Sequence, residues 1–464
     1  MKWITALFIV CCAPALLAFT VLHGSGGATQ PSTCPQGTAI ADGCSAAPTG
    51  TPQLAVMLVS NSVSVLTVTA GSGYTNGTGY ALSFSGGGCS AQPTGTIDVV
   101  GGSLINAQLL THGSGCTAGA GPTVSLPGGV GAGTGGVVTT SVYSTRPSWN
   151  IAGVDYAVGP RSSPTKVAGV DPAPSCVTQT AGQWNINSDN CVISGWTLTN
   201  WLIQGCNSSA NPTITDNIFI ANQPVLDLQG TVNSCSDSDG YNISYNTFDG
   251  TTGTTAWGDE GFILHGRQGT TVAQYNLFKN SPSDQIDASQ GNVTIRYNVF
   301  VNNGYRDGCS GASLHPDVIQ TGGFGAVYTS FVIDFNFVVQ SEYPCGGTGG
   351  GSQGFTLDGN TNGCPTNCPV FDGGHANNNV ILLTATPKGA TGQGMRFAVD
   401  QMPASSSFTT SGNYIDPTGL TTATSQAFQQ SSSGTTCGTC TWLLNGNVNL
   451  IGATPSTWNT NVPG

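Results

Sequence analysis

The sequence predicts an all-β solenoid. Three observations support this fold class: the segment after the N-terminus lacks the 3.6-residue apolar period of an amphipathic helix, short β-branched runs recur, and most of these runs end at an asparagine. The chain has 464 residues, of which 67 are glycine, 25 are proline and 32 are charged. Recurrent Ile, Val, Phe and Trp at strand spacing supply the apolar area that a disordered chain of low charge would lack.

The asparagines define the repeating unit, which is a strand, a bend at Asn and a second strand. Each asparagine is followed by one residue and then usually by Phe, Ile or Val. The intervals range from 17 to 43 residues, which indicates a coil of fixed size with loops of variable length. The repeated positions are Asn200, Asn217, Asn246, Asn276, Asn298, Asn336, Asn379 and Asn413.

The N-x-F pattern and the strand before each asparagine cover roughly half of the chain. They resemble the right-handed parallel β-helices of the pectin-lyase-like superfamily. This resemblance implies a right-handed parallel β-helix, in which stacked asparagines bond to the backbone and to one another while the following Phe fills the core. Parallel strands also fit the lack of hairpin signals between repeats. We expect one continuous line of side chains from Asn217, Asn246, Asn276, Asn298 and Asn336.

A glycine-rich module precedes the predicted helix. Residues 69–87 align without a gap to residues 111–129, and Gly71, Gly73, Gly113 and Gly115 suit turns with positive φ. This pattern resembles the glycine-rich β repeats of phage and bacterial surface proteins. The predicted organisation is a signal peptide or anchor (1–28), a linker (29–53), the tandem β repeat module (54–143), a linker and N-terminal cap (144–180), the parallel β-helix (181–420) and a C-terminal cap or tail (421–464).

The leader and the cysteines both indicate export. One lysine, a long apolar run and small residues at Ala15, Ala18 and Ala28 form the pattern of a secretory signal. An uncleaved anchor is the alternative, because Trp3 to Leu22 is long enough to span a bilayer. Beyond the leader, 14 cysteines fall into neighbouring pairs, so we expect sequential disulfides and a secreted or cell-surface protein. The pairs are Cys34–Cys44, Cys89–Cys116, Cys176–Cys191, Cys206–Cys235, Cys309–Cys345, Cys364–Cys368 and Cys437–Cys440.

The balance of charged residues excludes some classes of binding partner. With 10 Lys and Arg against 22 Asp and Glu, the chain is acidic and has no basic face for nucleic acid. It would contact a membrane only through an uncleaved leader. The partner that we expect is a polysaccharide or a cell-surface glycan, and the sequence leaves open whether the chain is a monomer or a homotrimer.

Candidate site residues come from a second strand in each coil. Aligning "VLDLQG", "FILHGR", "QIDASQ", "DVIQTG", "FTLDGN" and "FAVDQM" on the last inward aliphatic residue predicts one outward column. Residues 257–317 also hold 10 of the 32 charged residues, so function is expected there. The predicted column is Gln229, His265, Asp287, Gln320, Asp358 and Asp400, and Gln229, Gln320, Asp358 and Asp400 are assigned to substrate binding.

Three functions fit these residues. A polysaccharide lyase would use His265, Arg267, Asp287 and His315 as catalytic residues, with Ca²⁺ held by Asp284, Asp287 and Asp317. A glycoside hydrolase would use Asp317 with Asp284 or Asp287. A spike or adhesin would bind glycan without turnover. The chain lacks the closely spaced acidic pairs of polygalacturonase-like hydrolases and the Arg-containing segment of pectate lyases, so the resemblance carries the fold and no activity.

Overall fold

The computed structural model of the chain describes most of the β-helix and the module before it. The described residues are 52–54, 58–119, 121–205, 211–221, 225–227, 240–251, 262–265, 270–288, 292–305, 316–321, 330–344, 353–358, 372–385, 397–400, 407–419, 427–430, 441–459 and 462–463.

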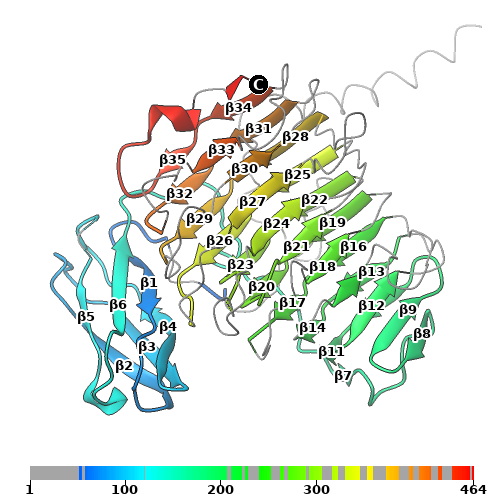
Figure 1. The fold of residues 1–464 in the computed structure, drawn as a ribbon, viewed down its shortest axis with the longest axis horizontal. Helices are drawn as coiled ribbons and strands as arrows, with labels where there is room; N and C mark the ends of the chain where they lie inside the picture. The colour runs from blue at the N-terminus through cyan, green and yellow to red at the C-terminus, as the bar shows by residue number, and fades with distance from the viewer. Residues whose placement is uncertain are drawn as a thin grey trace, which may run out of the picture.

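The chain folds as a right-handed parallel β-helix with three long sheets (Figure 1). Strands three apart in chain order lie side by side and parallel, so each coil contributes one strand to each sheet. Sheet I contains β10 (Val192–Ser194), β13 (Thr213–Thr215), β16 (Tyr241–Ser244), β19 (Thr270–Gln274), β22 (Asn292–Arg296), β25 (Ser330–Asp334), β28 (Asp372–Asn377), β31 (Ser407–Ser411), β34 (Thr441–Asn445) and the antiparallel β36 (Val462–Pro463).

Sheets II and III complete each coil. Sheet II contains β7 (Lys166–Val167), β11 (Trp196–Thr199), β14 (Ile218–Ile220), β17 (Thr247–Asp249), β20 (Leu277–Lys279), β23 (Val299–Val301), β26 (Phe337–Gln340), β29 (Val380–Leu383), β32 (Tyr414–Asp416) and β35 (Val448–Asn449). Sheet III contains β8 (Val177–Thr180), β9 (Gln183–Ile186), β12 (Leu202–Gly205), β15 (Leu226–Asp227), β18 (Ile263–His265), β21 (Ile286–Ala288), β24 (Asp317–Thr321), β27 (Gln353–Asp358), β30 (Phe397–Asp400) and β33 (Phe428–Gln430). The antiparallel β8–β9 pair closes one end of sheet III.

The interior of the helix is a stack of like residues. Phe219, Phe248, Phe278 and Phe300 occupy the same position on successive coils, with ring centroids 4.6–4.8 Å apart. Their side chains are buried, and Ile and Val from the other two sheets pack against them. Burying each such side chain contributes roughly 1.5–3 kcal/mol. The repeated N-x-F of the sequence therefore builds the core one coil at a time.

The predicted asparagine line is confirmed. Asn217, Asn246, Asn276, Asn298 and Asn336 are all buried, and the Nδ2 of each donates to the Oδ1 of the next asparagine at 3.0–3.1 Å. The line continues through Asn379, Asn413 and Asn447. A backbone carbonyl of the preceding coil also accepts from each Nδ2, as Ala273 does from Asn298. The ladder thus satisfies amides that would be costly to bury singly.

The ladder differs at two positions from the set of repeated asparagines. Asn200 is outside the line, because the register places Trp196 opposite Asn217 and the Trp196 N–H donates to the Asn217 Oδ1 at 3.0 Å. Asn447 was not among the predicted positions and adds the last rung, where its backbone N–H donates to the Asn459 Oδ1. In both cases the register between neighbouring strands of sheet II decides whether an asparagine joins the ladder. The N-x-F pattern is local and does not specify that register.

The residue before each ladder asparagine turns the chain. It has positive φ in every coil, at Tyr245, Tyr275, Tyr297 and Phe335 among others. Bulky side chains in this conformation cost about 1–2 kcal/mol each. Here the four rings stack on the outside of the bend, with centroids 5.1–5.4 Å apart, which offsets part of that cost.

The N-terminal module is antiparallel and lies beside the later coils (Figure 1). One sheet pairs β1 (Val63–Thr69) with β6 (Val137–Val142), and a second has the order β4 (Ser103–Thr111), β3 (Thr94–Val100), β2 (Gly77–Ser85) and β5 (Thr123–Ser125). A short 3-10 helix, η1 (Gly128–Val130), precedes β6, and a second, η2 (Ser456–Asn459), lies near the C-terminus. Gly71, Gly73, Gly113 and Gly115 all have positive φ, as predicted.

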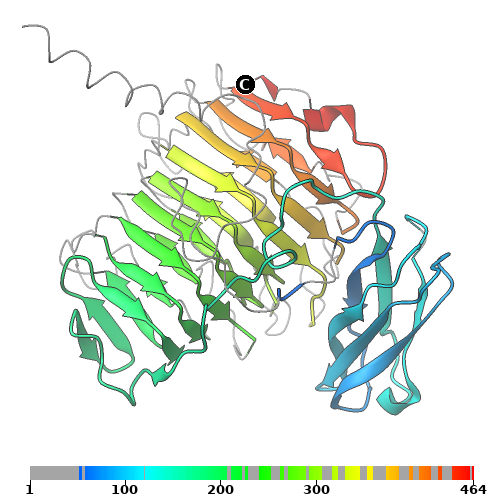
Figure 2. The ribbon, with the colours of Figure 1, turned by 180° about the vertical axis from the view of Figure 1, so that it is seen from behind.

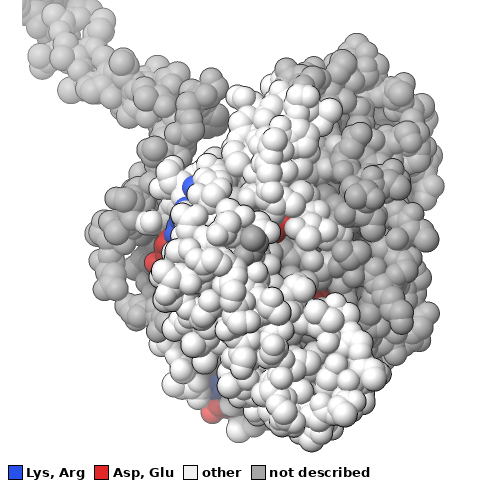
Figure 3. Space-filling model, turned by 90° about the vertical axis from the view of Figure 1, so that its left-hand side faces the viewer, with Lys and Arg blue, Asp and Glu red and all other residues white. Residues whose placement is uncertain are grey.

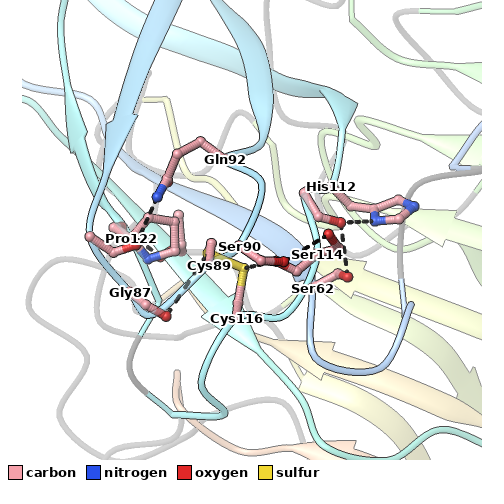
Figure 4. Close-up of a disulfide and its surroundings, with 12 residues drawn as sticks. Ser62, Gly87, Cys89, Ser90, Gln92, His112, Ser114, Cys116 and Pro122 are labelled. Atoms are coloured by element: carbon pink, nitrogen blue, oxygen red, sulfur yellow. Dashed lines mark hydrogen bonds between the residues drawn. A yellow bond between two sulfur atoms is a disulfide. The ribbon is translucent and has the colours of Figure 1, made fainter.

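Two of the seven predicted disulfides lie within the described residues, and both are present. Cys89–Cys116 joins the segment just after the first copy of the module repeat to the second copy, beside the Ser90–Ser114 contact (Figure 4). Cys176–Cys191 joins the cap before β9 to the residue before β10. The other five predicted pairs lie outside the described residues.

A linker connects the module back to the first coil. After β6 it runs along the outside of the bends (Figure 2). There Trp149 packs edge-on against Phe335, and Tyr156 packs against Tyr275. Further on, Arg161 donates to Asp216, and β7 then pairs with β11. The module therefore sits near the later coils although it precedes the helix in sequence. Within the described residues, no helix is both long and apolar enough to cross a membrane.

Candidate functional site

The candidate site lies on sheet III, where a short polar row crosses adjacent coils. The register pairs Asp287 on β21 with Gln320 on β24, and Gln320 with Thr356 on β27. Neighbouring parallel strands place these positions about 4.8 Å apart. All three side chains are partly exposed, whereas their strand neighbours Ile286 and Ile319 are buried. We call Asp287, Gln320 and Thr356 the polar row.

The rest of the predicted column is corrected by the register. Asp287 lies opposite Leu264, and His265 lies opposite Ala288, one position away from the row. A shift of one residue moves a strand position to the other face of a sheet. Asp358 pairs with Asp400 but lies two positions beyond Thr356, so these two form a separate row. The alignment failed because it assumed that the last aliphatic residue is equivalent in every strand.

A buried acidic pair lies beside the polar row. Asp284 and Asp317 are each 1% exposed, and the backbone N–H of Asp317 donates to the Asp284 Oδ1 at 2.5 Å. The Thr356 hydroxyl donates to the Asp317 Oδ1 at 2.7 Å. Thr356 therefore belongs to the polar row and also contacts the pair. The structure brings together four of the predicted residues, Asp284, Asp287, Asp317 and Gln320, and adds Thr356.

Further buried polar groups surround Asp284. The Ser281 hydroxyl donates to the main-chain carbonyl of Asp284 at 2.6 Å, and the N–H of Gln285 donates to the main-chain carbonyl of Asp317 at 2.9 Å. Ser281, Ser283 and Gln285 are fully buried. Among the described residues, the Gln285 Oε1 accepts no hydrogen bond. A buried carbonyl oxygen that accepts no hydrogen bond destabilises the fold by about 1–3 kcal/mol. The bend around Asp284 therefore buries polar groups at a cost in stability.

The predicted Ca²⁺ site is not tested by the structure. Among the described residues, no three His, Cys, Asp or Glu side chains are grouped so that they could hold a metal ion, so Asp284, Asp287 and Asp317 do not form such a group by themselves. The Asp284 carboxylate accepts from the backbone N–H of Asp317 on the adjacent coil, and carboxylate oxygen is a ligand that Ca²⁺ prefers. The Ca²⁺ assignment stays a prediction.

Several predicted residues lie outside the description. Gln229, Arg267 and His315 are outside the described residues, and of His265, Asp358 and Asp400 only the strand positions are described. The catalytic set predicted for a lyase therefore has one described side chain, Asp287.

Sequence reasoning missed a second polar group on sheet III, nearer the N-terminal cap. The Gln183 Nε2 donates to the Asn185 Oδ1 and the Gln204 Oε1, both at 2.5 Å, and the Gln204 Nε2 donates to the Asp227 Oδ2 at 3.2 Å. Asn185, Gln204 and Asp227 are successive positions of the line that continues through Leu264 to Asp287. Extending the register from Asp287 back through the earlier strands would have identified them.

A separate pocket of about 570 Å³ lies at the N-terminal end of the helix. It is lined by Lys166, Asp189, Trp196 and the Cys176–Cys191 disulfide, among others. Trp196 is only 2% exposed, so its ring offers no open face for stacking a sugar. The pocket lies on the first coil, several coils away from the acidic pair, and we do not assign it to the candidate site.

Comparison with protein-family models, with curated proteins and with solved structures finds no match to this chain.

Proposed function

We propose that this protein is exported and binds a polysaccharide along the outer face of sheet III. The observation that carries the proposal is the register of Asp287, Gln320 and Thr356, which lines up a carboxylate, an amide and a hydroxyl on three adjacent coils. Sugar hydroxyl groups both donate and accept hydrogen bonds, and these three side chains offer both roles at regular spacing.

The scarcity of charge supports this assignment. Only 32 of 464 residues are charged, and the face seen in Figure 3 shows charged side chains only in a few small, separate patches over the described residues. Three aspartates on two adjacent coils are therefore a local concentration. The acidic balance disfavours anionic partners such as nucleic acid, whereas a glycan needs hydrogen bonds and little charge. The two disulfides are compatible with an extracellular protein.

Glycoside hydrolysis by Asp284 and Asp317 is the second candidate. Hydrolases of this class use two carboxyl groups, one as an acid and the other as a base or nucleophile. The direct contact between Asp284 and the backbone of Asp317 favours this pair. Both side chains are 1% exposed, so a substrate reaches them only after neighbouring segments move. This barrier is why binding is the first proposal, and lyase chemistry, with its Ca²⁺, remains the alternative form of turnover.

Glycan arrays followed by titration calorimetry test the binding proposal. We expect Asp287→Asn and Gln320→Ala each to weaken binding about 5- to 100-fold, since each removes one or two hydrogen bonds worth about 1–3 kcal/mol in total. Thr294→Ala, a partly exposed polar residue of sheet I, is the matched control and should bind as the parent does. Equal affinity of all four proteins, or no glycan bound by the parent, would contradict the proposal.

Turnover is measured on the glycans that bind. Reducing ends report hydrolysis, and absorbance of unsaturated products reports a lyase. Asp284→Asn should abolish reducing-end release while glycan affinity stays within a few-fold of the parent, if the pair hydrolyses the glycan. Chelation of Ca²⁺ should abolish lyase activity and leave hydrolysis unchanged. If the parent protein binds a glycan and releases neither reducing ends nor unsaturated products, both forms of turnover are contradicted and the binding proposal stands alone.

A further inference from the structure

The contact between the module and the helix contains a buried glutamate. Glu342 follows β26 and forms a parallel bridge with Val68 of β1, whose N–H donates to the Ser341 carbonyl at 3.0 Å. The Glu342 residue is 5% exposed. It therefore lies within the interface, where the edge of the module meets the coil.

Glu342 receives its hydrogen bonds from both sides of this interface. From the module, the backbone N–H of Asn106 donates to its Oε2 at 2.7 Å, and from the helix the Asn302 Nδ2 donates to its Oε1 at 3.1 Å. Asn106 has a φ of 54° and lies at an irregularity in the β3–β4 register, which turns its N–H away from β3. The bent strand thus directs a backbone donor at the carboxyl group.

The electrostatic surroundings disfavour an ionised Glu342. Within the described residues it makes no salt bridge, and the charged group that acts on it is Asp98 of β3, whose Oδ2 accepts from the Asn106 Nδ2. Burial raises the pKa of Glu342 from 4.5 to about 7, with the Asn106 N–H lowering it and the Asp98 charge adding to the increase. The facing side chains Asn302 and Gln340 are uncharged.

We propose that Glu342 is a proton-controlled contact, which holds the β4 bend of the module tightly against the helix in mild acid and loosens it at neutral to alkaline pH. The sign follows from linkage, because a carboxyl that binds its proton more tightly in the docked state favours docking while it is protonated. The stabilisation is complete below the ordinary value of 4.5 and is lost as the pH rises through about 7.

The change is local. An apolar cluster including Leu58, Val65, Phe337, Val339 and Val380 packs the segments around the module against sheet II at every pH. One carboxylate does not outweigh that contact. The expected opening is confined to the bend at Asn106 and to the adjoining bridge at Val68. The difference between 4.5 and about 7 corresponds to about two orders of magnitude in that local equilibrium.

Native-state amide hydrogen exchange of the full chain tests the proposal. After correction for the intrinsic pH dependence of exchange, protection of the Asn106 and Val68 amides should fall about 100-fold between pH 5 and pH 8.5, with a midpoint at about pH 6 on a logarithmic scale and little further change above about 7. Amides of the ladder, such as those of Asn276 and Asn298, serve as internal references and should not change. Protection of Asn106 that is constant over this range would overturn the proposal.

Two variants distinguish Glu342 from Asp416 of β32, a second buried acid, whose carboxyl group accepts from the Tyr143 hydroxyl just after β6. Glu342→Gln keeps the shape of the side chain and removes its titratable group. The Asn106 amide should therefore stay protected from exchange at every pH. A pH-dependent loss of protection that persists in this variant would assign the effect to another group and contradict the proposal. Asp98→Asn removes the neighbouring charge and should move the midpoint to lower pH. An unchanged midpoint in Asp98→Asn also contradicts the proposed electrostatic origin.

Discussion

The asparagine ladder and the module–helix interface bury polar groups in opposite ways. In the ladder, seven side-chain bonds join eight successive asparagines, so each amide has at least one partner of its own kind. At the interface, Glu342 and Asp416 are single carboxyl groups that accept from neutral donors, Asn106 and Asn302 for the first and Tyr143 and Thr418 for the second. A repeated coil can satisfy a buried uncharged amide with the same amide on the next coil. A contact that occurs once can instead bury an ionisable carboxyl group.

The comparison teaches where this molecule responds to pH. The ladder has no titratable group, so its hydrogen bonds are independent of pH. Burial raises the pKa of Asp416, and the hydrogen bonds from Thr418 and Tyr143 oppose that increase. Both interface acids are therefore easier to protonate than exposed carboxyl groups. The ladder is thus expected to be insensitive to pH, whereas the contact with the module contains two carboxyl groups whose pKa is raised.

The largest expected effect comes from breaking the ladder in its middle. Asn298→Ala removes the bonds from Nδ2 to the Ala273, Arg296 and Asn336 oxygens and leaves the N–H of Asn276 without its acceptor. Unsatisfied buried groups cost about 1–3 kcal/mol each, so we expect a loss of about 3–5 kcal/mol in the free energy of unfolding. Denaturant titration measures it.

Asn187→Ala is the control for the ladder variant, because Asn187 is exposed and its Nδ2 bonds only to the Thr178 hydroxyl at 2.9 Å among the described contacts. We expect a loss of about 0.5 kcal/mol or less. Similar losses for the two variants would show that the ladder is no more important than a surface amide.

A smaller effect is expected at the interface. The Tyr143 hydroxyl donates to the Asp416 Oδ2, and both residues are buried. Tyr143→Phe removes one donor from a carboxyl group, which should cost about 1–3 kcal/mol at neutral pH. The loss should shrink as the pH falls and Asp416 becomes protonated, because its pKa is already raised by burial. Thermal unfolding between pH 4 and pH 8 measures the trend, and a loss that grows in acid would contradict it.

The smallest effect is expected where the linker crosses the bends. Arg161 donates to both carboxylate oxygens of Asp216, and its guanidinium lies 4.5 Å from the centre of the Tyr245 ring. Because Arg161 is 43% exposed, solvent screens the pair, and Arg161→Ala should cost only about 0.5 kcal/mol. A decrease of more than about 2 kcal/mol in the free energy of unfolding would contradict this prediction, because the linker contact would then stabilise the fold nearly as much as a ladder asparagine does.

The pH dependence of this pair has the opposite sign to that of Glu342. Burial acts to raise the pKa of Asp216, but the bonds from Arg161 outweigh it and the pKa is lowered. The contribution is therefore present above the ordinary value of 3.8 and is lost as the pH falls through the lowered value. The difference in melting temperature between parent and Arg161→Ala should vanish in strong acid.

Much of the helix could be predicted because its signals are local. The N-x-F pattern places an amide and an aromatic ring at fixed positions of each coil, and stacking identical coils brings like residues together. The positive φ of Gly71, Gly73, Gly113 and Gly115 is also a local property. The candidate site was harder, because an outward row depends on how each strand of sheet III is shifted against the next. The sequence alignment was wrong by one residue at His265, which pairs with Ala288 and not with Asp287. It was wrong by two residues in β27, where Thr356 and not Asp358 pairs with Gln320.

The parallel β-helix and its line of asparagines could be predicted because residue types repeat at short range, and two disulfides could be predicted because their cysteines are neighbours in the chain. Only the tertiary structure decided that the module lies against the later coils, that Trp196 begins the ladder, and that Thr356 joins the polar row to Asp317. Glu342 became notable for the same reason. Its partner Asn106 is 236 residues away in the chain, and no local pattern encodes a contact over that distance, because the chain path between the two sets which surfaces meet.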